Sequence, residues 1–248
     1  MTQPTPAATN LDGKVALVTG AAKRLGRAIA LHLAAEGADV VVHYHQSRDQ
    51  AEEVVAEIKK LGRRAISLPA NLQKKSDLDQ LFAAAAEEFG RLDILVNNAS
   101  NFLHTEFTTT TEESWDASFD VNLKAPFFCS QAAAPLLKKN RGVIINLSDV
   151  AGLLGWTGYI PHCISKAGII MLTRALAKEL APEVRVNAIA PGTITMPGDA
   201  PELETDYIKR APLRRTGTTA DVATAVSFLV NSPFITGQII VLDGGRTL

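Results

Sequence analysis

The feature that most constrains the fold of this 248-residue chain is a regular alternation of short apolar runs with amphipathic helical patterns. The strand-like runs are residues 14–19, 39–43, 64–68, 92–96, 142–147, 184–189 and 238–242, and the helical patterns are residues 24–36, 48–61, 75–89, 112–139, 162–180 and 218–230. Strands that are apolar on both faces and alternate with helices are typical of a parallel sheet covered on each side. We therefore predict one α/β domain over residues 11–248, a doubly wound parallel sheet of about seven strands.

Composition and charge argue against several classes of protein. The net charge is −1 and no block of five like charges occurs, so neither nucleic acid nor an anionic membrane is expected as a partner. No apolar run is long enough to span a membrane, and residues 1–10 lack the features of a signal peptide, so we expect a flexible leader there. Cys129 and Cys163 make no disulfide framework, and no Cys/His cluster has zinc spacing. We predict a cytoplasmic protein without a metal.

A glycine-containing turn follows the first predicted strand. The strand ends at Thr19 and Gly20, and a helical pattern begins within a few residues. A strand, a tight turn and a helix N-terminus form a geometry that binds phosphate through backbone N–H groups and the helix dipole. Gly20 permits the turn, and Gly26 lets the helix approach a cofactor or a strand because it has no Cβ. We interpret the turn as the phosphate loop of a Rossmann-type domain; an ordinary strand-to-helix turn is the alternative.

The end of the second predicted strand indicates which dinucleotide is bound. In a doubly wound sheet an acidic residue there accepts a hydrogen bond from the ribose 2′-hydroxyl of NAD and repels the 2′-phosphate of NADP. Here His45, Gln46, Ser47 and Arg48 follow the strand, without a carboxylate, and Arg24 adds a cation. We therefore predict that the chain binds NADP(H). Because Gln46 is neutral, we expect a weaker preference for NADP(H) over NAD(H) than an arginine at that position would give. Arg48 is either a phosphate contact or a solvated residue at a helix start.

Two local signals complete the pattern. Thr110-Thr-Glu-Glu113 fits a capping box before the long fourth helix. Residues 192–215 hold several prolines and interrupt the alternation of strands and helices. A long irregular loop at the carboxyl edge of such a sheet predicts a lid over a ligand.

Several motifs occur in the order found in one enzyme family. They are Thr19-Gly20 to Gly26, Asn97-Asn98-Ala99-Ser100, Val121-Asn122, Ser165-Lys166-Ala167-Gly168, Arg185-Val-Asn187 to Pro191-Gly192, and Thr236-Gly237 to Asp243-Gly-Gly245. Over residues 13–246 the chain thus resembles the short-chain dehydrogenase/reductases. The Thr-Gly-Ala-Ala-Lys-Arg-Leu-Gly loop, His43-Tyr44-His45, Asn97-Asn-Ala-Ser-x-Phe102 and Asp149 are most similar to pteridine reductases, which reduce pterins and folates with NADPH.

The resemblance implies a set of binding residues. The coenzyme would contact Gly20, Arg24, Leu25, Gly26, His45, Gln46, Ser47, Asn71, Leu72, Asn98, Ala99, Ser100, Lys166, Pro191 and Gly192. The substrate would contact Phe102, Tyr159, Ser100 and Arg24. Phe102 would stack a planar pterin against the nicotinamide, although a core phenylalanine is the alternative.

The resemblance also implies four catalytic residues, one of which departs from the family. Asn122 would hold a water in a proton relay, and Lys166 would bind the nicotinamide ribose and ease proton donation. The family's signature is a tyrosine four residues before the lysine; here His162 takes the place of that tyrosine before Lys166. The family's serine, thirteen residues before the tyrosine, is replaced by Asp149. His162 must be an imidazolium to protonate a substrate; the Lys166 cation opposes that form and ionised Asp149 supports it. Alternatively, Asp149 passes a proton through water.

Three hypotheses for function follow. The leading one is an NADPH-dependent reductase of a pterin or folate-like substrate. The second is a carbonyl or 3-oxoacyl reductase of the same family, disfavoured because a carboxylate at 149 repels a developing alkoxide. The third is an NADP(H)-binding protein with weak or no catalysis, suggested by the missing tyrosine. The resemblance further implies a homotetramer.

Overall fold

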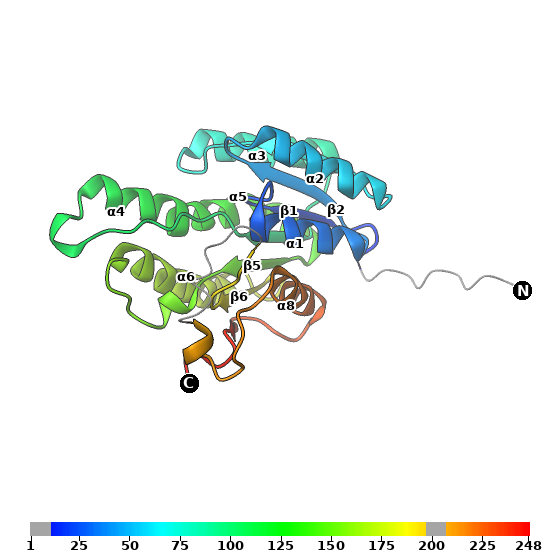
Figure 1. Cartoon of the computed structure of the whole chain (residues 1–248). Coiled ribbons are helices and arrows are strands. Elements are labelled where there is room, and N and C mark those ends of the chain that lie inside the picture. Colours follow the sequence, from blue (N-terminus) through cyan, green and yellow to red (C-terminus); the bar gives the residue numbers. More distant parts are fainter. Residues whose placement is uncertain (1–10, 197–206) are drawn as a thin grey trace, which may run out of the picture.

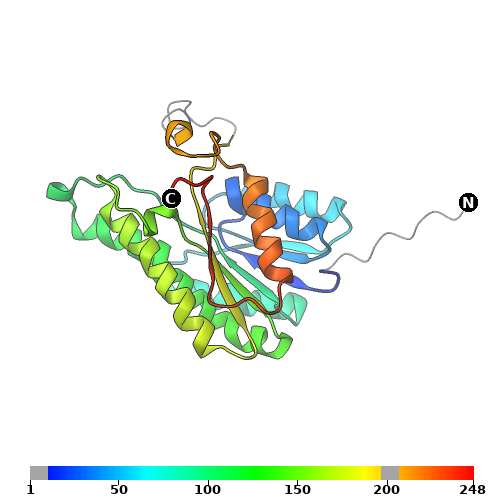
Figure 2. The ribbon, with the colours of Figure 1, turned by 90° about the horizontal axis from the view of Figure 1, so that it is seen from below.

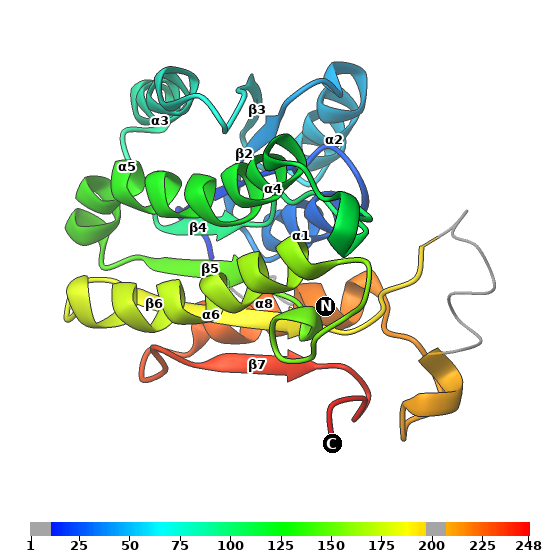
Figure 3. The same ribbon diagram turned by 90° about the vertical axis from the view of Figure 1, so that its left-hand side faces the viewer.

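The computed structural model describes residues 11–196 and 207–248; the predicted leader and the centre of the predicted lid lie outside the described residues. Seven parallel strands form one sheet in the order β3-β2-β1-β4-β5-β6-β7 (Figure 3). The strands are β1 Val15–Val18, β2 Asp39–Tyr44, β3 Ala65–Pro69, β4 Ile94–Asn97, β5 Val143–Leu147, β6 Arg185–Pro191 and β7 Ile239–Leu242. The predicted fold class and all seven strands are confirmed.

Helices cover both faces of the sheet because the central strands are apolar on both faces. Every residue of β1, β4 and β5 is buried. One face packs against α1 (Arg24–Ala35), α2 (Arg48–Lys60) and α8 (Thr219–Asn231), and the other against α3 (Lys75–Phe89), α5 (Ala125–Asn140) and α6 (Ile160–Glu179) (Figures 1 and 2). This three-layer arrangement is the one that the alternating pattern predicts.

The long fourth helix predicted over residues 112–139 is interrupted. α4 (Glu112–Phe119) passes into a π-helical turn (Asp120–Lys124) before α5 begins. The predicted capping box is also shifted by one residue: Thr111 is the N-cap and its partner is Ser114, while the Thr110 hydroxyl donates to the Glu106 carbonyl. The π-helical turn carries Asn122, so the irregularity falls on a predicted catalytic residue, as is common for such turns.

The order of the strands reverses direction between β1 and β4. In open parallel sheets a ligand crevice forms at such a switch point, outside the carboxyl ends of the strands. The loops after β1, β4, β5 and β6 therefore meet at one edge of the sheet. Within the described part of the chain, no helix combines the length and apolarity needed to cross a membrane.

Candidate active site

The loop after β1 builds a cradle that only glycine fits. Gly20 has φ +64°, and a Cβ on Gly26 would lie 2.2 Å from the Gly20 carbonyl oxygen. Asn98 secures the loop, because its side-chain amide donates to the Thr19 carbonyl at 2.8 Å. Arg24 also adopts positive φ, +51°, the region in which other dinucleotide loops place glycine. The residues thus fit the close approach of a dinucleotide phosphate at the N-terminus of α1.

A buried histidine, named above only as part of a motif and without a role, ties this loop to the neighbouring strands. The Gly20 N–H donates to Nδ1 of His43 at 2.9 Å, and Nε2 of His43 lies 3.1 Å from the Ala70 carbonyl, to which it donates. Burial lowers the pKa of His43 to about 4, so the ring is neutral at physiological pH. The sequence did offer one signal: His43 is a polar residue that follows three valines in β2. From that position it supports the phosphate loop.

The groove beside this loop collects most of the predicted coenzyme residues. Its walls include Gly20, Arg24, Leu25, Gly26, His45, Asn71, Leu72, Asn98, Ala99 and Ser100. Gln46 and Ser47, also predicted, are not among the described lining residues, because the chain turns into α2 there. Lys23 and Gln73 line the groove and were missed. None of its described lining residues is acidic, which fits a 2′-phosphate better than a 2′-hydroxyl.

A second cavity of about 550 Å³ opens from this groove, since Arg24, Leu25, Asn98, Ser100 and Asn101 line both. Except for Asn122, which lies behind His162, it contains the remaining predicted site residues: Phe102, Asp149, Tyr159, His162, Lys166, Pro191 and Gly192. Its aromatic wall includes the rings of Phe102 and Tyr159, stacked with centroids 4.4 Å apart, and Trp156, which was not predicted. Phe102 is exposed and not a core residue, as the substrate hypothesis expects.

Lys166 is a buried cation at the base of this cavity. Its Nζ donates to the Leu147 carbonyl at 3.0 Å. Burial lowers the pKa of Lys166 to about 8, partly opposed by the charge of Asp149. The ammonium has two further N–H donors for a ligand, and its proton is unusually easy to remove.

Asn122 fixes the orientation of His162. The Asn122 Oδ1 accepts from the Asn101 backbone N–H at 2.8 Å, and its Nδ2 donates to the Asn101 carbonyl at 3.1 Å. These two backbone partners determine which end of the amide is nitrogen. The Nδ2 lies 3.4 Å from Nδ1 of His162, so an amide donor faces that ring nitrogen. The resting His162 is therefore best accommodated as the neutral tautomer with its proton on Nε2.

The other nitrogen of His162, Nε2, is buried without a hydrogen-bond partner among the described residues, and the ring of Phe102 packs edge-on against the imidazole with centroids 4.8 Å apart. The His162 side chain is only 3% exposed. Oδ2 of Asp149 is 3.8 Å away, too far for a hydrogen bond, and Oδ1 accepts from the Ala151 N–H at 2.7 Å. A buried polar atom without a partner is costly unless a ligand satisfies it.

The described residues contain no cluster of three or more His, Cys, Asp or Glu side chains able to hold a metal ion. The predicted catalytic side chains gathered at or beside the second cavity are those of Asn122, Asp149, His162 and Lys166. The structure brings all four together, with the first three in contact through His162.

The chain is similar to known proteins over nearly its whole length. A family model described as Enoyl-(Acyl carrier protein) reductase matches residues 20–247. The 3-oxoacyl-[acyl-carrier-protein] reductase of Synechocystis sp. is 41% identical over 245 residues, covering 97% of this chain and 99% of that protein.

Two solved structures resemble the fold with TM-scores of 0.91. A blue fluorescent protein from a metagenomic library, in complex with NADPH, is 32% identical and covers 96% of this chain and 100% of its own. A 7α-hydroxysteroid dehydrogenase complexed with NADH and 7-oxo glycochenodeoxycholic acid is 33% identical and covers 98% of each chain. None of these three proteins is named a pteridine reductase, so the narrower resemblance found in the sequence gains no support.

Proposed function

The chain belongs to the short-chain dehydrogenase/reductase family of oxidoreductases, and we propose that it uses NADPH to reduce the carbonyl group of a 3-oxoacyl or related substrate. The observation that carries this proposal is the pairing of a buried cation, Lys166, with an unpartnered ring nitrogen of His162 in a cavity open to the dinucleotide groove. The 41% identical 3-oxoacyl reductase supports the substrate class, which reverses the order of the hypotheses drawn from the sequence.

The groove residues have defined roles in this proposal. When bound, NADPH supplies a hydride to the substrate. Gly20 and Gly26 allow the pyrophosphate to approach the N-terminus of α1, and Lys23 and Arg24 offer positive charge to the 2′-phosphate. Pro191, the last residue of β6, and Gly192 line the active-site cavity and would position the nicotinamide.

The proton comes from the site's own side chains. Nε2–H of neutral His162 donates a hydrogen bond to the substrate oxygen and polarises the carbonyl, as a neutral histidine does in triosephosphate isomerase, a known example. Lys166 stabilises the developing alkoxide and releases the proton that the oxygen takes up. The C=O π bond is thereby replaced by one C–H and one O–H bond.

A pterin-like substrate remains a second candidate because of two observations. The Asp149 carboxylate lies beside His162, where its negative charge would repel an alkoxide. The same carboxylate, when protonated, is suited to protonate a ring nitrogen. The Phe102 and Tyr159 rings provide flat surfaces for a planar heterocycle. Asp149 would then be the proton donor.

Stopped-flow NADPH oxidation separates these candidates. We expect turnover with 3-oxobutanoyl-pantetheine and loss of about 10²-fold in kcat for His162→Phe, with much smaller loss for His162→Gln, which keeps an N–H donor. Turnover with dihydrobiopterin alone, abolished in Asp149→Asn, would establish the second candidate. NADPH binding by calorimetry without oxidation of any substrate, including simple ketones and dihydrofolate, would refute both.

We further propose that the enzyme is a cytoplasmic homotetramer. Cys129 and Cys163 are buried and unpaired, in keeping with a reducing compartment. Exposed apolar side chains on α5 and α6, including Phe127, Ile164 and Met171, offer a surface for self-association.

A further inference from the structure

A third cavity, of about 770 Å³, lies directly beyond the active-site cavity. Trp156, Tyr159 and Thr193 line both, so a substrate extending past Tyr159 enters the third cavity. Val150 and Leu154 add apolar surface to its wall. Nothing in the proposed reduction uses this space.

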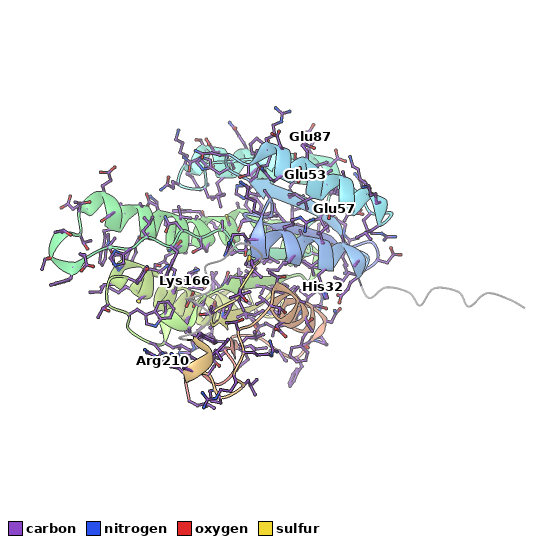
Figure 4. The ribbon with its side chains drawn as sticks, in the orientation of Figure 1. His32, Glu53, Glu57, Glu87, Lys166 and Arg210 are labelled. Carbon is purple, nitrogen blue, oxygen red and sulfur yellow. The ribbon has the colours of Figure 1, made fainter. Side chains whose placement is uncertain are left out.

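The charges of this third cavity are positive. Arg246 is half-buried in its wall, and Arg210 lies on the helical segment at 207–210. Figure 4 shows Arg210 on the same side of the molecule as Lys166. No described residue of the lining is acidic.

The neighbouring polar side chains are hydrogen-bonded to the backbone, so Arg246 is the main group able to bind a ligand. The Asp243 carboxylate is turned toward the backbone, accepting from the N–H groups of Gly245 at 2.8 Å and Thr247 at 2.7 Å. The Tyr207 hydroxyl donates to the Asp243 carbonyl at 2.5 Å. Burial raises the pKa of Tyr207, and the nearby positive charge of Arg246 opposes this shift. A half-buried guanidinium in a concave wall is suited to bidentate contact with a carboxylate or phosphate.

We propose that this third cavity binds an anionic group, a carboxylate or a phosphate, at the far end of the substrate whose carbonyl is reduced beside His162. Arg246 is the principal contact and Arg210 the second, while Trp156 and Leu154 pack against the chain that joins the two ends. This inference rests on the proposed reductase function and names its substrate class as anionic.

Matched pairs of neutral and anionic substrates test the proposal. For phosphate, the pair is 3-oxobutanoyl-pantetheine and its 4′-phosphopantetheine counterpart; for carboxylate, methyl 5-oxohexanoate and 5-oxohexanoate. We expect KM about tenfold lower for the anionic member of at least one pair, and the pair that responds identifies the source of the charge. Arg246→Gln removes this difference without changing kcat or the KM of the neutral member. Arg174→Gln, an exposed residue on α6 with the same loss of charge, retains it.

Two results distinguish the failure of this proposal from failure of the reductase function. If both pairs are reduced but Arg246→Gln leaves each anionic-to-neutral KM ratio unchanged, the anion site is wrong and the reductase stands. If neither pair is reduced, the reductase proposal fails, and calorimetry with 4′-phosphopantetheine and 5-oxohexanoate decides the anion site. Binding that Arg246→Gln weakens tenfold supports it, and equal or absent binding in the two proteins overturns it.

Discussion

At the scale of single residues, His43 makes the stability of the fold depend on pH. Its ring is neutral in the folded protein, where its pKa is about 4, and titrates near 6.5 when unfolded. A lowered histidine pKa contributes stability that is fully present above pH 6.5 and is lost as the pH falls from 6.5 to 4. The whole shift corresponds to roughly 3 kcal/mol.

We therefore expect the free energy of unfolding to fall by about 2 kcal/mol between pH 7 and pH 5 through this residue alone. In His43→Asn, which retains an acceptor for the Gly20 N–H without titrating, this part of the loss disappears. Urea unfolding of both proteins at the two pH values measures it. Equal pH dependence in the two proteins would contradict the assignment.

Lys166 sets the pH dependence of the proposed reduction. Its pKa of about 8 means that the cation is present at neutral pH and is lost above pH 8. We expect kcat/KM to fall about tenfold per pH unit above that value. A pH–rate profile checks this, with NADPH binding followed in parallel as the control. A decline that already begins on the acidic side of neutral and vanishes in His162→Phe would instead identify an imidazolium acid, the form considered from the sequence.

The sequence predicted most residues of this site, and the exceptions share a cause. The motifs around Gly20, Asn98 and Lys166 could be identified because their spacing along the chain carries the information. His43, Trp156 and Arg246 could not, because their roles depend on contacts with residues distant in sequence. The tautomer of His162 likewise depends on Asn122, forty residues earlier.

At the scale of elements, the junction between β1 and α1 depends on Gly26. A Cβ there would lie 2.2 Å from the Gly20 carbonyl oxygen and 2.5 Å from Nδ2 of Asn98. Because Gly20 is held by His43, the loop cannot easily yield. We expect Gly26→Ala to lower NADPH affinity at least tenfold, by fluorescence titration, and also to lower the melting temperature. Gly155→Ala, where a Cβ meets open space, should change neither.

The boundaries of most elements followed from local patterns, whereas the break in the fourth helix did not. Apolar periodicity runs through residues 112–139 without a proline or glycine at the π-helical turn. The turn contains Asn122, whose amide bonds to Asn101 and Ser165 in other segments. Such tertiary contacts override a local helical pattern and carry no local signature.

At the scale of the whole molecule, we expect four copies to associate. α5 and α6 lie on the same face of the sheet (Figure 3) and expose Phe127 and Met171, the latter 61% exposed. Sedimentation equilibrium should give a mass about four times 26.5 kDa, reduced by Met171→Glu. Leu61→Glu serves as the control, because Leu61 is also an exposed apolar residue (49%) but lies just beyond α2 on the opposite face of the sheet. A monomer at micromolar concentration would refute the tetramer.

The wall shared by the dinucleotide groove and the active-site cavity has a kinetic consequence. Since Arg24, Leu25, Asn98, Ser100 and Asn101 belong to both, the space that receives the carbonyl is bounded on one side by whatever fills the groove. When the groove is empty, the substrate site lacks one of its walls. We therefore expect sequential binding, in which NADPH binds first and NADP⁺ leaves last, so that NADP⁺ competes directly with NADPH for the free enzyme.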